Sequence, residues 1–311
     1  MLSRVADSIY WMARYIERAE NVARFIHVNL NLALDLGPEL EQWAPLIFTT
    51  GDEHTFLERY PVASRETVIQ FLTLDEENPN SILSCLQAAR ENARTVRDII
   101  SSEMWEELNK FYLMVCEAAK KSSEVESPFE FYGKIKGHGA MLEGLAETTM
   151  SRGEAWHFRR LGRLIERAEK TSRILDVKYY LLLPTADDVG TPLDTNQWTA
   201  LLKSASALEM YRKRHGRITP EQVAEFLILD RDFPRSMHFC LIRAEQSLVA
   251  ITGGGPTTIR TSAEQRLGRL RAELDYASIK EIIGGGLHEF IDAFQVKLNA
   301  VGAAIFETFF A

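Results

Sequence analysis

The sequence predicts an all-α protein, a long-helix bundle built from a tandem duplication of about 150 residues. First, RYIERAENVAR at 14–24 and RLIERAEKTSR at 163–173 share seven of eleven residues at an offset of 149. Second, FLTLDEENPNS at 71–81 and FLILDRDFPRS at 226–236 share six of eleven residues at an offset of 155. Third, apolar residues recur every three or four positions, as on one face of a helix, and no comparable stretch alternates with the period of two that a strand shows.

The order of the repeated blocks is the same in both copies, which places the two helical repeats at 1–148 and 149–311. Long amphipathic helices need a facing helix to bury their apolar stripe. We therefore expect the two halves to pack about a pseudo-twofold axis as one merged bundle rather than as separate domains.

Apolar spacing and turn residues predict six helices in the first half. The opening helix carries a stripe with alternating spacings of three and four residues: Ile9, Met12, Ile16, Ala19, Ala23, Ile26 and Leu30. A loop is expected at 122–130, where serine, glutamate and proline cluster. The expected helices span about 3–34, 39–60, 64–73, 80–100, 101–121 and 131–148.

Six helices are expected in the second half by the same criteria. Its opening helix repeats the stripe at the same offset, with Phe158, Leu161, Ile165, Ala168, Ser172, Leu175 and Tyr179. Loops are expected at Pro184–Pro192 and Gly253–Pro256. The expected helices span about 151–182, 194–215, 219–228, 234–250, 261–275 and 278–308.

Composition excludes several classes of function. The 311 residues are 46% apolar and 26% charged, which is ordinary for a globular protein. A net charge of -8 argues against a nucleic-acid binder, whose affinity comes mainly from neutralising phosphates. No segment approaches the ~18–20 apolar residues needed to span a bilayer, and the N-terminus does not resemble a signal peptide. We expect a cytoplasmic protein whose three cysteines are free thiols.

Both copies keep charged residues beside the apolar stripe. One interpretation is a buried ion-pair network that fixes how the two long helices cross, because removing one member of such a pair can cost ~3–5 kcal/mol. The other is a pocket whose arginines bind an anionic group bidentately while the glutamates orient it. An arginine beside each glutamate disfavours a divalent cation, so neither a metal nor a cofactor is expected. The residues are Arg14, Glu17, Arg18 and Glu20, repeated as Arg163, Glu166, Arg167 and Glu169.

The second repeated block contains turn residues. Asp75 and Asn78 precede Pro79, and Asp230 stands at the position of Asp75 in the second copy. Aspartate and asparagine bond their own backbone in turns, so a structural role in the turn is expected.

A basic stripe follows on the next helix of the first half. It contains Arg90 and Arg94, with Asn92 between them. We expect these residues either to neutralise the glutamates of the first helix across the bundle or to bind an anion. The second copy reads RAEQSL at 243–248 and lacks the stripe, so such a site would exist in the first half only.

Taken together, LSRVADSIYWMARYIERAENVAR, FLTLDEENPNSILSCLQAARENAR and GRLIERAEKTSRILDV resemble the bacterial alpha-E domain family over essentially the whole chain. That family is named for an all-helical fold with a Glu-Arg motif. By position the motif falls on Glu17-Arg18 and on Glu166-Arg167.

The resemblance implies a role in peptide synthesis or modification. Genes of the family typically neighbour an ATP-grasp peptide ligase and a transglutaminase-like peptidase. The first hypothesis is thus a helical partner protein that docks or activates the ligase or presents its peptide substrate. The alternative is an enzyme using a Glu/Arg cleft for acid-base chemistry on a peptide or amino acid. A third is a structural scaffold that forms a homo-oligomer.

Overall fold

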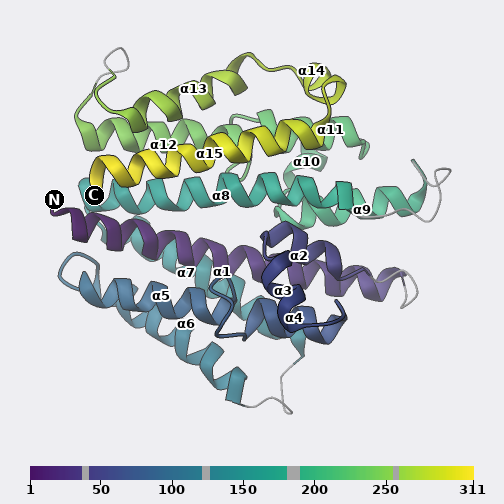
Figure 1. Ribbon diagram of the computed structural model, residues 1–311, viewed down its shortest axis with the longest axis horizontal. Coiled ribbons are helices and arrows are strands. Elements are labelled where there is room, and N and C mark those ends of the chain that lie inside the picture. The colour runs from purple at the N-terminus through teal and green to yellow at the C-terminus, as the bar shows by residue number, and fades with distance from the viewer. Residues whose placement is uncertain (37–41, 121–126, 181–189, 255–258) are drawn as a thin grey trace.

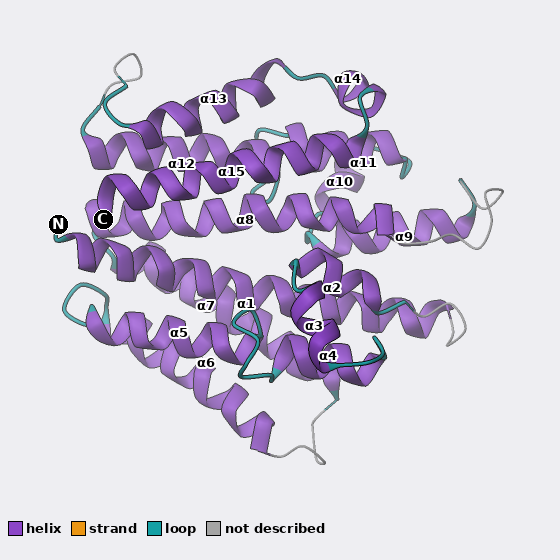
Figure 2. Cartoon of the chain, in the orientation of Figure 1, coloured by secondary structure: helices purple, strands orange, loops and turns teal. Residues whose placement is uncertain are grey.

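A computed structural model describes residues 1–36, 42–120, 127–180, 190–254 and 259–311 (Figure 1). Within these ranges the chain forms fifteen α-helices and no β-strand, as Figure 2 shows, so the all-α prediction is confirmed. None of the described helices combines the length and the apolar character that crossing a bilayer requires.

Two long helices, α1 (Ser3–Leu36) and α8 (Glu154–Tyr180), lie side by side through the middle of the molecule (Figure 1). They run in the same direction. The amino group of Met1 lies 2.7 Å from Glu154 at the start of α8, and Arg18 further along α1 pairs with Glu166 further along α8. Gly162 permits the close approach: a Cβ there would lie 2.4 Å from the carbonyl oxygen of Tyr10. Positions about 149 residues apart therefore face each other, whereas the duplication itself stays a prediction.

The remaining helices of the first half gather around α1. It packs on α5 and α7, α6 covers those two, and α2 reaches across to α8. The bounds are α2 (Ala44–Thr50), α3 (Glu53–Arg59), α4 (Arg65–Thr73), α5 (Ile82–Thr95), α6 (Ser102–Lys120) and α7 (Pro128–Thr149).

In the second half, α8 is the central helix, as α1 is in the first half. It packs on α12 and α15, and α13 lies against both of those helices on the outside (Figure 1). The bounds are α9 (Pro192–Ser204), α10 (Leu208–Arg214), α11 (Pro220–Leu229), α12 (Met237–Thr252), α13 (Ser262–Tyr276), α14 (Ile279–Gly284) and α15 (Leu287–Phe309).

The predicted apolar stripes face the interior. One continuous core joins both halves, with Ile16 partly covered and the other six residues of the first stripe buried. The second stripe is buried from Phe158 to Leu175, its serine included. Burial of both stripes against neighbouring helices is the main stabilisation that such long helices have.

Three helices expected to be continuous are each broken in two by left-handed backbone. The breaks lie at Gly51 (φ +79°), Ser206 (φ +50°) and Gly286 (φ +95°), and such φ values end a helix. The helices concerned were expected at 39–60, 194–215 and 278–308.

Smaller differences concern loops and ends. The helix expected to reach residue 100 ends at Thr95, and helix α7 starts at Pro128, inside the loop expected at 122–130. The predicted loop at Pro184–Pro192 lies mostly outside the described residues, and part of Gly253–Pro256 does as well.

Candidate functional site

The Glu-Arg motifs of α1 and α8 bind each other reciprocally. Arg18 donates from Nε to Oε1 of Glu166 at 2.7 Å and from Nη2 to Oε2 at 3.1 Å. Arg167 donates from Nε to Oε1 of Glu17 at 2.9 Å and from Nη2 to Oε2 at 2.7 Å. Such bidentate pairs are strong and directional. Because Glu17 is 2% exposed and Glu166 is 0% exposed, each buried acid is neutralised by the other helix's arginine.

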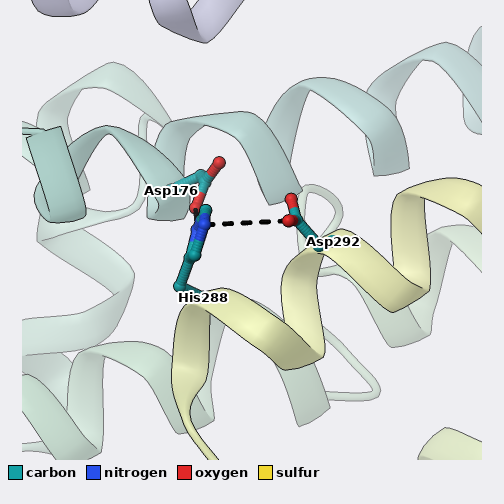
Figure 3. Close-up of side chains that lie close together, drawn as sticks. All are labelled: Asp176, His288 and Asp292. Carbon is teal, nitrogen blue, oxygen red and sulfur yellow. Dashed lines mark hydrogen bonds and ion pairs between the residues drawn. The ribbon is translucent and has the colours of Figure 1, made fainter.

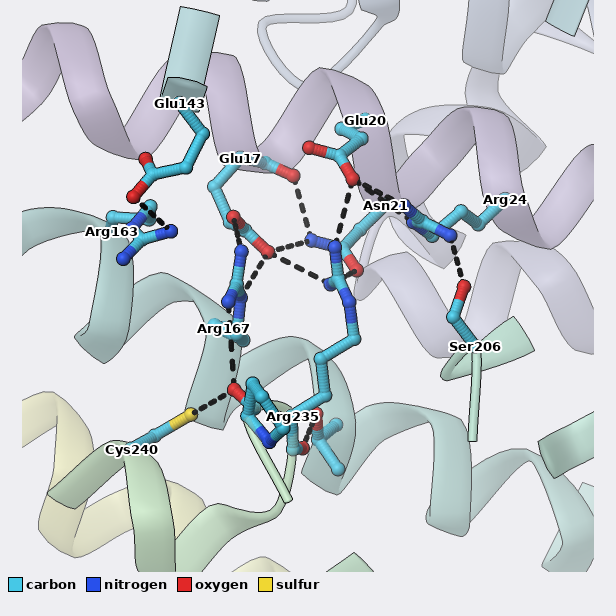
Figure 4. A network of polar contacts seen from close by, with 12 residues as sticks. Glu17, Glu20, Asn21, Arg24, Glu143, Arg163, Arg167, Ser206, Arg235 and Cys240 are labelled. Atoms are coloured by element: carbon cyan, nitrogen blue, oxygen red, sulfur yellow. Dashed lines mark hydrogen bonds and ion pairs between the residues drawn. The ribbon is translucent and has the colours of Figure 1, made fainter. Parts of the chain in front are cut away.

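Each glutamate also receives a second cation. Glu166 accepts from Nε of Arg14 at 2.8 Å. Glu17 accepts from Nη1 of Arg235 at 3.0 Å, and the other terminal nitrogen of that arginine reaches Oε1 of Glu20 at 2.8 Å (Figure 4). The two acids therefore lie inside a network whose cations come from three helices or their flanking turns.

The network holds both carboxyl groups in the ionised form. Burial alone would raise the pKa of Glu17, but the charges of Arg167 and Arg235 outweigh it and hold that pKa well below its usual range. Burial acts in the same way on Glu166, whose pKa is held well below its usual range by Arg18 and Arg14. Neither acid is poised to exchange a proton near neutral pH.

Of the other charged residues of the repeats, some join this network and others pair with residues beside it. Glu169 accepts from Nη2 of Arg14 at 3.3 Å, and Glu20 bonds Arg24 one turn further along α1. Arg163 faces α7, where its Nη1 lies 2.7 Å from Oε1 of Glu143 (Figure 4).

The basic stripe of α5 lies elsewhere. Nε of Arg90 donates to Oδ1 of Asn109 on α6 at 2.8 Å, and Arg94 pairs with Glu91 of its own helix. Asn92 lies half-buried between the two arginines. The prediction that this stripe neutralises the glutamates of α1 is wrong, since each arginine follows a core position and points away from the α1–α8 contact.

The predicted turn residues lie in turns and bond to backbone there. Oδ1 of Asp75 accepts from the amide of Glu77 at 3.0 Å, and Nδ2 of Asn78 donates to the carbonyl of Phe71 at 3.0 Å. Oδ1 of Asp230 accepts from the amide two residues later at 2.8 Å.

A pocket of about 490 Å³ opens beside Glu166, between α1, α8, α15 and the turn that joins α2 to α3. Small residues of α15, Gly302 and Ala303, leave the space open. Four cationic side chains, two acidic ones and four aromatic rings line it. The charged residues are Arg14, Arg18, Lys170, Arg173, Asp52 and Glu169, and the aromatic residues are Tyr10, Trp11, Phe306 and Phe310.

The corresponding space beside Glu17 is much smaller, and the side chain of Arg235 reaches Glu17 there (Figure 4). Arg235 is buried there, at the position that corresponds to Asn80 by the 155-residue offset. Helix α7 adds Glu143, which binds Arg163 and Arg159. A hollow of about 30 Å³ is left. The two sides of the network thus differ: one is packed and the other is accessible.

Sequence reasoning missed several residues of the pocket. Lys170 and Arg173 lie within the second repeat, so their inclusion could have been inferred from the motif. Asp52 carries no comparable signal, because it reaches the pocket only when α2 folds back onto α8. Asn80 enters the pocket from the turn before α5, where its Oδ1 accepts from Nη1 of Arg18 at 2.6 Å.

A separate cluster joins the end of α8 to the start of α15. Nδ1 of His288 lies 2.6 Å from Oδ1 of Asp176, and Nε2 lies 3.7 Å from Oδ2 of Asp292 (Figure 3). One ligand atom from each residue falls within 4.8 Å of the others, so this group has the chemistry to hold a cation. It includes none of the glutamates of the repeats.

Comparison with known proteins bears on the whole chain. The sequence profile of the Alpha-E family, described as a predicted alpha-helical domain with a conserved ER motif, matches residues 1–310. The Glu-Arg dipeptides at 17–18 and 166–167 fit that description.

Curated relatives are longer than this chain. An uncharacterized protein of Mycobacterium bovis and two of Mycobacterium tuberculosis strains are each 23% identical over 318 residues. Each match covers 91% of this chain and 35% of the relative, so the chain spans about a third of those proteins. No solved structure matches significantly.

Proposed function

We propose that this chain, which belongs to the Alpha-E family, is a binding module that serves an ATP-grasp-type peptide ligase by holding an anionic group of the peptide substrate and presenting it. A transglutaminase-like peptidase is a further proposed partner. The observation that carries the proposal is the pocket beside Glu166, where four cationic side chains face two acidic ones in a chain of net charge -8.

The pocket has the features of a small-ligand site. Its volume of about 490 Å³ falls within the ~300–1,000 Å³ typical of such sites. Arginine and lysine recognise carboxylates well, particularly where water is partly excluded. The ion-pair network next to the pocket holds its walls in place, which reduces the ordering cost of binding.

Support for a partner comes from two directions. The resemblance to the family implies a neighbouring ATP-grasp ligase. In the mycobacterial relatives the matching segment is about a third of a longer polypeptide, so such a module can be joined to other segments in one chain. The implied neighbour and the longer relatives both favour a module that works together with another polypeptide.

Acid-base catalysis by Glu17 and Glu166, the glutamates that recur in both halves, is the weaker alternative. A general acid or base works best with a pKa near the working pH. Glu17 and Glu166 have pKa values held well below their usual range, and each is surrounded by guanidinium groups. These acids therefore support the fold of the site rather than chemistry in it.

Light scattering on a sizing column, with and without an ATP-grasp ligase of the kind that the family resemblance implies, tests the proposal. The expected result is a stable complex with changed ATP turnover in the same fractions. Arg173→Met should leave complex formation intact and reduce the effect of peptide on turnover. Absence of a complex together with unchanged turnover would contradict the role as a partner.

A further inference from the structure

We infer that the pocket takes a free α-amino acid with an apolar or aromatic side chain, binding its carboxylate at Lys170 and Arg173 and its ammonium group at Asp52. The inference rests on the proposed function and narrows it: the anionic group held in the pocket is the carboxylate of an amino acid that the ligase joins to the peptide. It goes further in requiring a protonated amine, which the carboxyl terminus of a peptide does not carry next to its carboxylate.

The requirement for an amine comes from Asp52. This residue is 9% exposed and lines the pocket. Its Oδ1 accepts from Nδ2 of Asn80 at 2.7 Å, but its Oδ2 is buried and accepts from no residue in the described ranges. A buried carboxylate oxygen without a donor is costly and rare, so a ligand donor is expected there.

The requirement for an anion comes from two cations that the network does not saturate. Nζ of Lys170 lies 3.5 Å from Glu166 and 3.8 Å from Glu169, longer than the ~2.7–3.2 Å of a normal hydrogen bond. Arg173 donates from Nε to Glu169 at 3.0 Å, and its two terminal nitrogens donate to no side chain or carbonyl that the structure describes.

Arg173 reaches the turn that carries Asp52, and Lys170 precedes Arg173 by one helical turn of α8. Nη1 of Arg173 lies against the backbone at Gly51, where a Cβ would meet it at 2.9 Å, and Asp52 is the next residue. Arg14 and Arg18, by contrast, already bond the glutamates of α8 and Asn80. The unused groups thus form an adjacent cationic pair and a single acceptor, the pattern that a zwitterion complements.

The aromatic part of the pocket indicates the side chain. Tyr10 packs on Phe310 with ring centroids 5.4 Å apart, and Trp11 lies beneath the guanidinium of Arg14. Phe306, which is half exposed, also lines the pocket. Aromatic rings bury apolar and aromatic groups well, so an amino acid such as phenylalanine or leucine fits better than a charged one.

Calorimetric titration of the chain tests the inference with L-phenylalanine and L-leucine as probes. N-acetyl-L-phenylalanine keeps the carboxylate and removes the ammonium charge, whereas L-phenylalanine amide does the reverse. Each derivative should bind roughly 10- to 100-fold more weakly than L-phenylalanine, which is the contribution of one charged hydrogen bond.

One matched pair of variants and one further variant locate the ligand. Arg173→Met should reduce phenylalanine affinity, whereas Arg24→Met, the position related by the 149-residue offset, should not, because Arg24 bonds Glu20 and Ser206 away from the pocket. Asp52→Asn should remove the preference for phenylalanine over its N-acetyl derivative and leave binding of that derivative unchanged. Thermal unfolding of each variant shows whether it is folded.

The outcomes separate this inference from the proposed function. Equal binding of phenylalanine and N-acetyl-L-phenylalanine, sensitive to Arg173→Met, would overturn the amino-acid inference and leave an anion site. Failure of phenylalanine and leucine to bind below about 1 mM, with binding of N-acetyl-L-phenylalanine, would have the same meaning. Failure of all four probes to bind would overturn both the inference and the anion-binding part of the proposed function.

Discussion

Replacing Glu166 by glutamine removes the charge at the centre of the network while keeping the shape of the side chain. The carboxylate is fully buried and accepts from Nε of Arg14 at 2.8 Å and from Nε and Nη2 of Arg18 at 2.7 and 3.1 Å. A glutamine would present an NH₂ group to one of these donors, so at least one contact becomes repulsive.

The loss of stability should be large, because two guanidinium groups would remain buried without their full counter-charge. Breaking a buried pair in this way costs ~3–5 kcal/mol. An unfolding entropy of ~2.1 cal/mol/K per residue gives roughly 0.65 kcal/mol/K for a chain of this length, so Tm should fall by about 5–8 °C.

Thermal and urea unfolding followed by circular dichroism measure this change. The matched control is Glu91→Gln, which removes an acid whose partner Arg94 is exposed, and which should cost less than ~1 kcal/mol. If Glu166→Gln were to cost no more than the control, the buried network would not be what holds α1 against α8.

Three further predictions concern the contact between α1 and α8 and its neighbours. Gly162→Ala should cost ~1–3 kcal/mol in urea unfolding by forcing α1 and α8 apart, whereas Gly137→Ala, which has open space around it, should not destabilise the fold. The pKa of Glu17 is lower in the folded chain than its ordinary value of 4.5. Its contribution to the free energy of unfolding is therefore present above that pH and is lost as pH falls through the folded pKa. The difference in stability between the unchanged chain and Glu17→Gln should shrink between pH 7 and pH 3. The hydrogen bond that the protonated ring of His288 donates to Asp176 raises the pKa of His288 above 6.5. This pair therefore stabilises the chain fully below that pH, and the stabilisation is lost as pH rises through the folded pKa. His288→Gln should lower Tm at pH 6 but not at pH 9, and equal losses at both would contradict a charged pair.

Much of the fold could be predicted from the sequence because it depends on local periodicity. The stripe from Ile9 to Leu30 has the spacing of a helix face, and no competing signal interrupts it. The breaks at Gly51 and Ser206 could not be predicted in the same way. A single left-handed residue ends a helix without changing the apolar pattern, and serine adopts that conformation rarely.

The sequence indicated the charged network between the two long helices but not the pocket beside it. The recurrence of Glu17 and Glu166 beside the stripe indicated a charged network, and their partners are the expected arginines. Two differences decide which side of the network is accessible. The side beside Glu166 has Asn80 where the side beside Glu17 has Arg235, and it has small residues of α15 where the other side has Glu143 of α7. The effect of those differences on the pocket could not be predicted from the sequence, because it depends on how the helices pack.

The measurement that tests the central claim most directly is calorimetric titration of N-acetyl-L-phenylalanine into the chain and into Asn80→Arg. That substitution copies the arrangement of Arg235, which binds Glu17 and Glu20, onto Glu166 and Glu169 on the other side. A pocket that binds an anionic group should be filled by the new guanidinium, so binding should be lost in a variant that thermal unfolding shows to be folded. Unchanged binding by the folded variant would show that the pocket beside Glu166 is not the site.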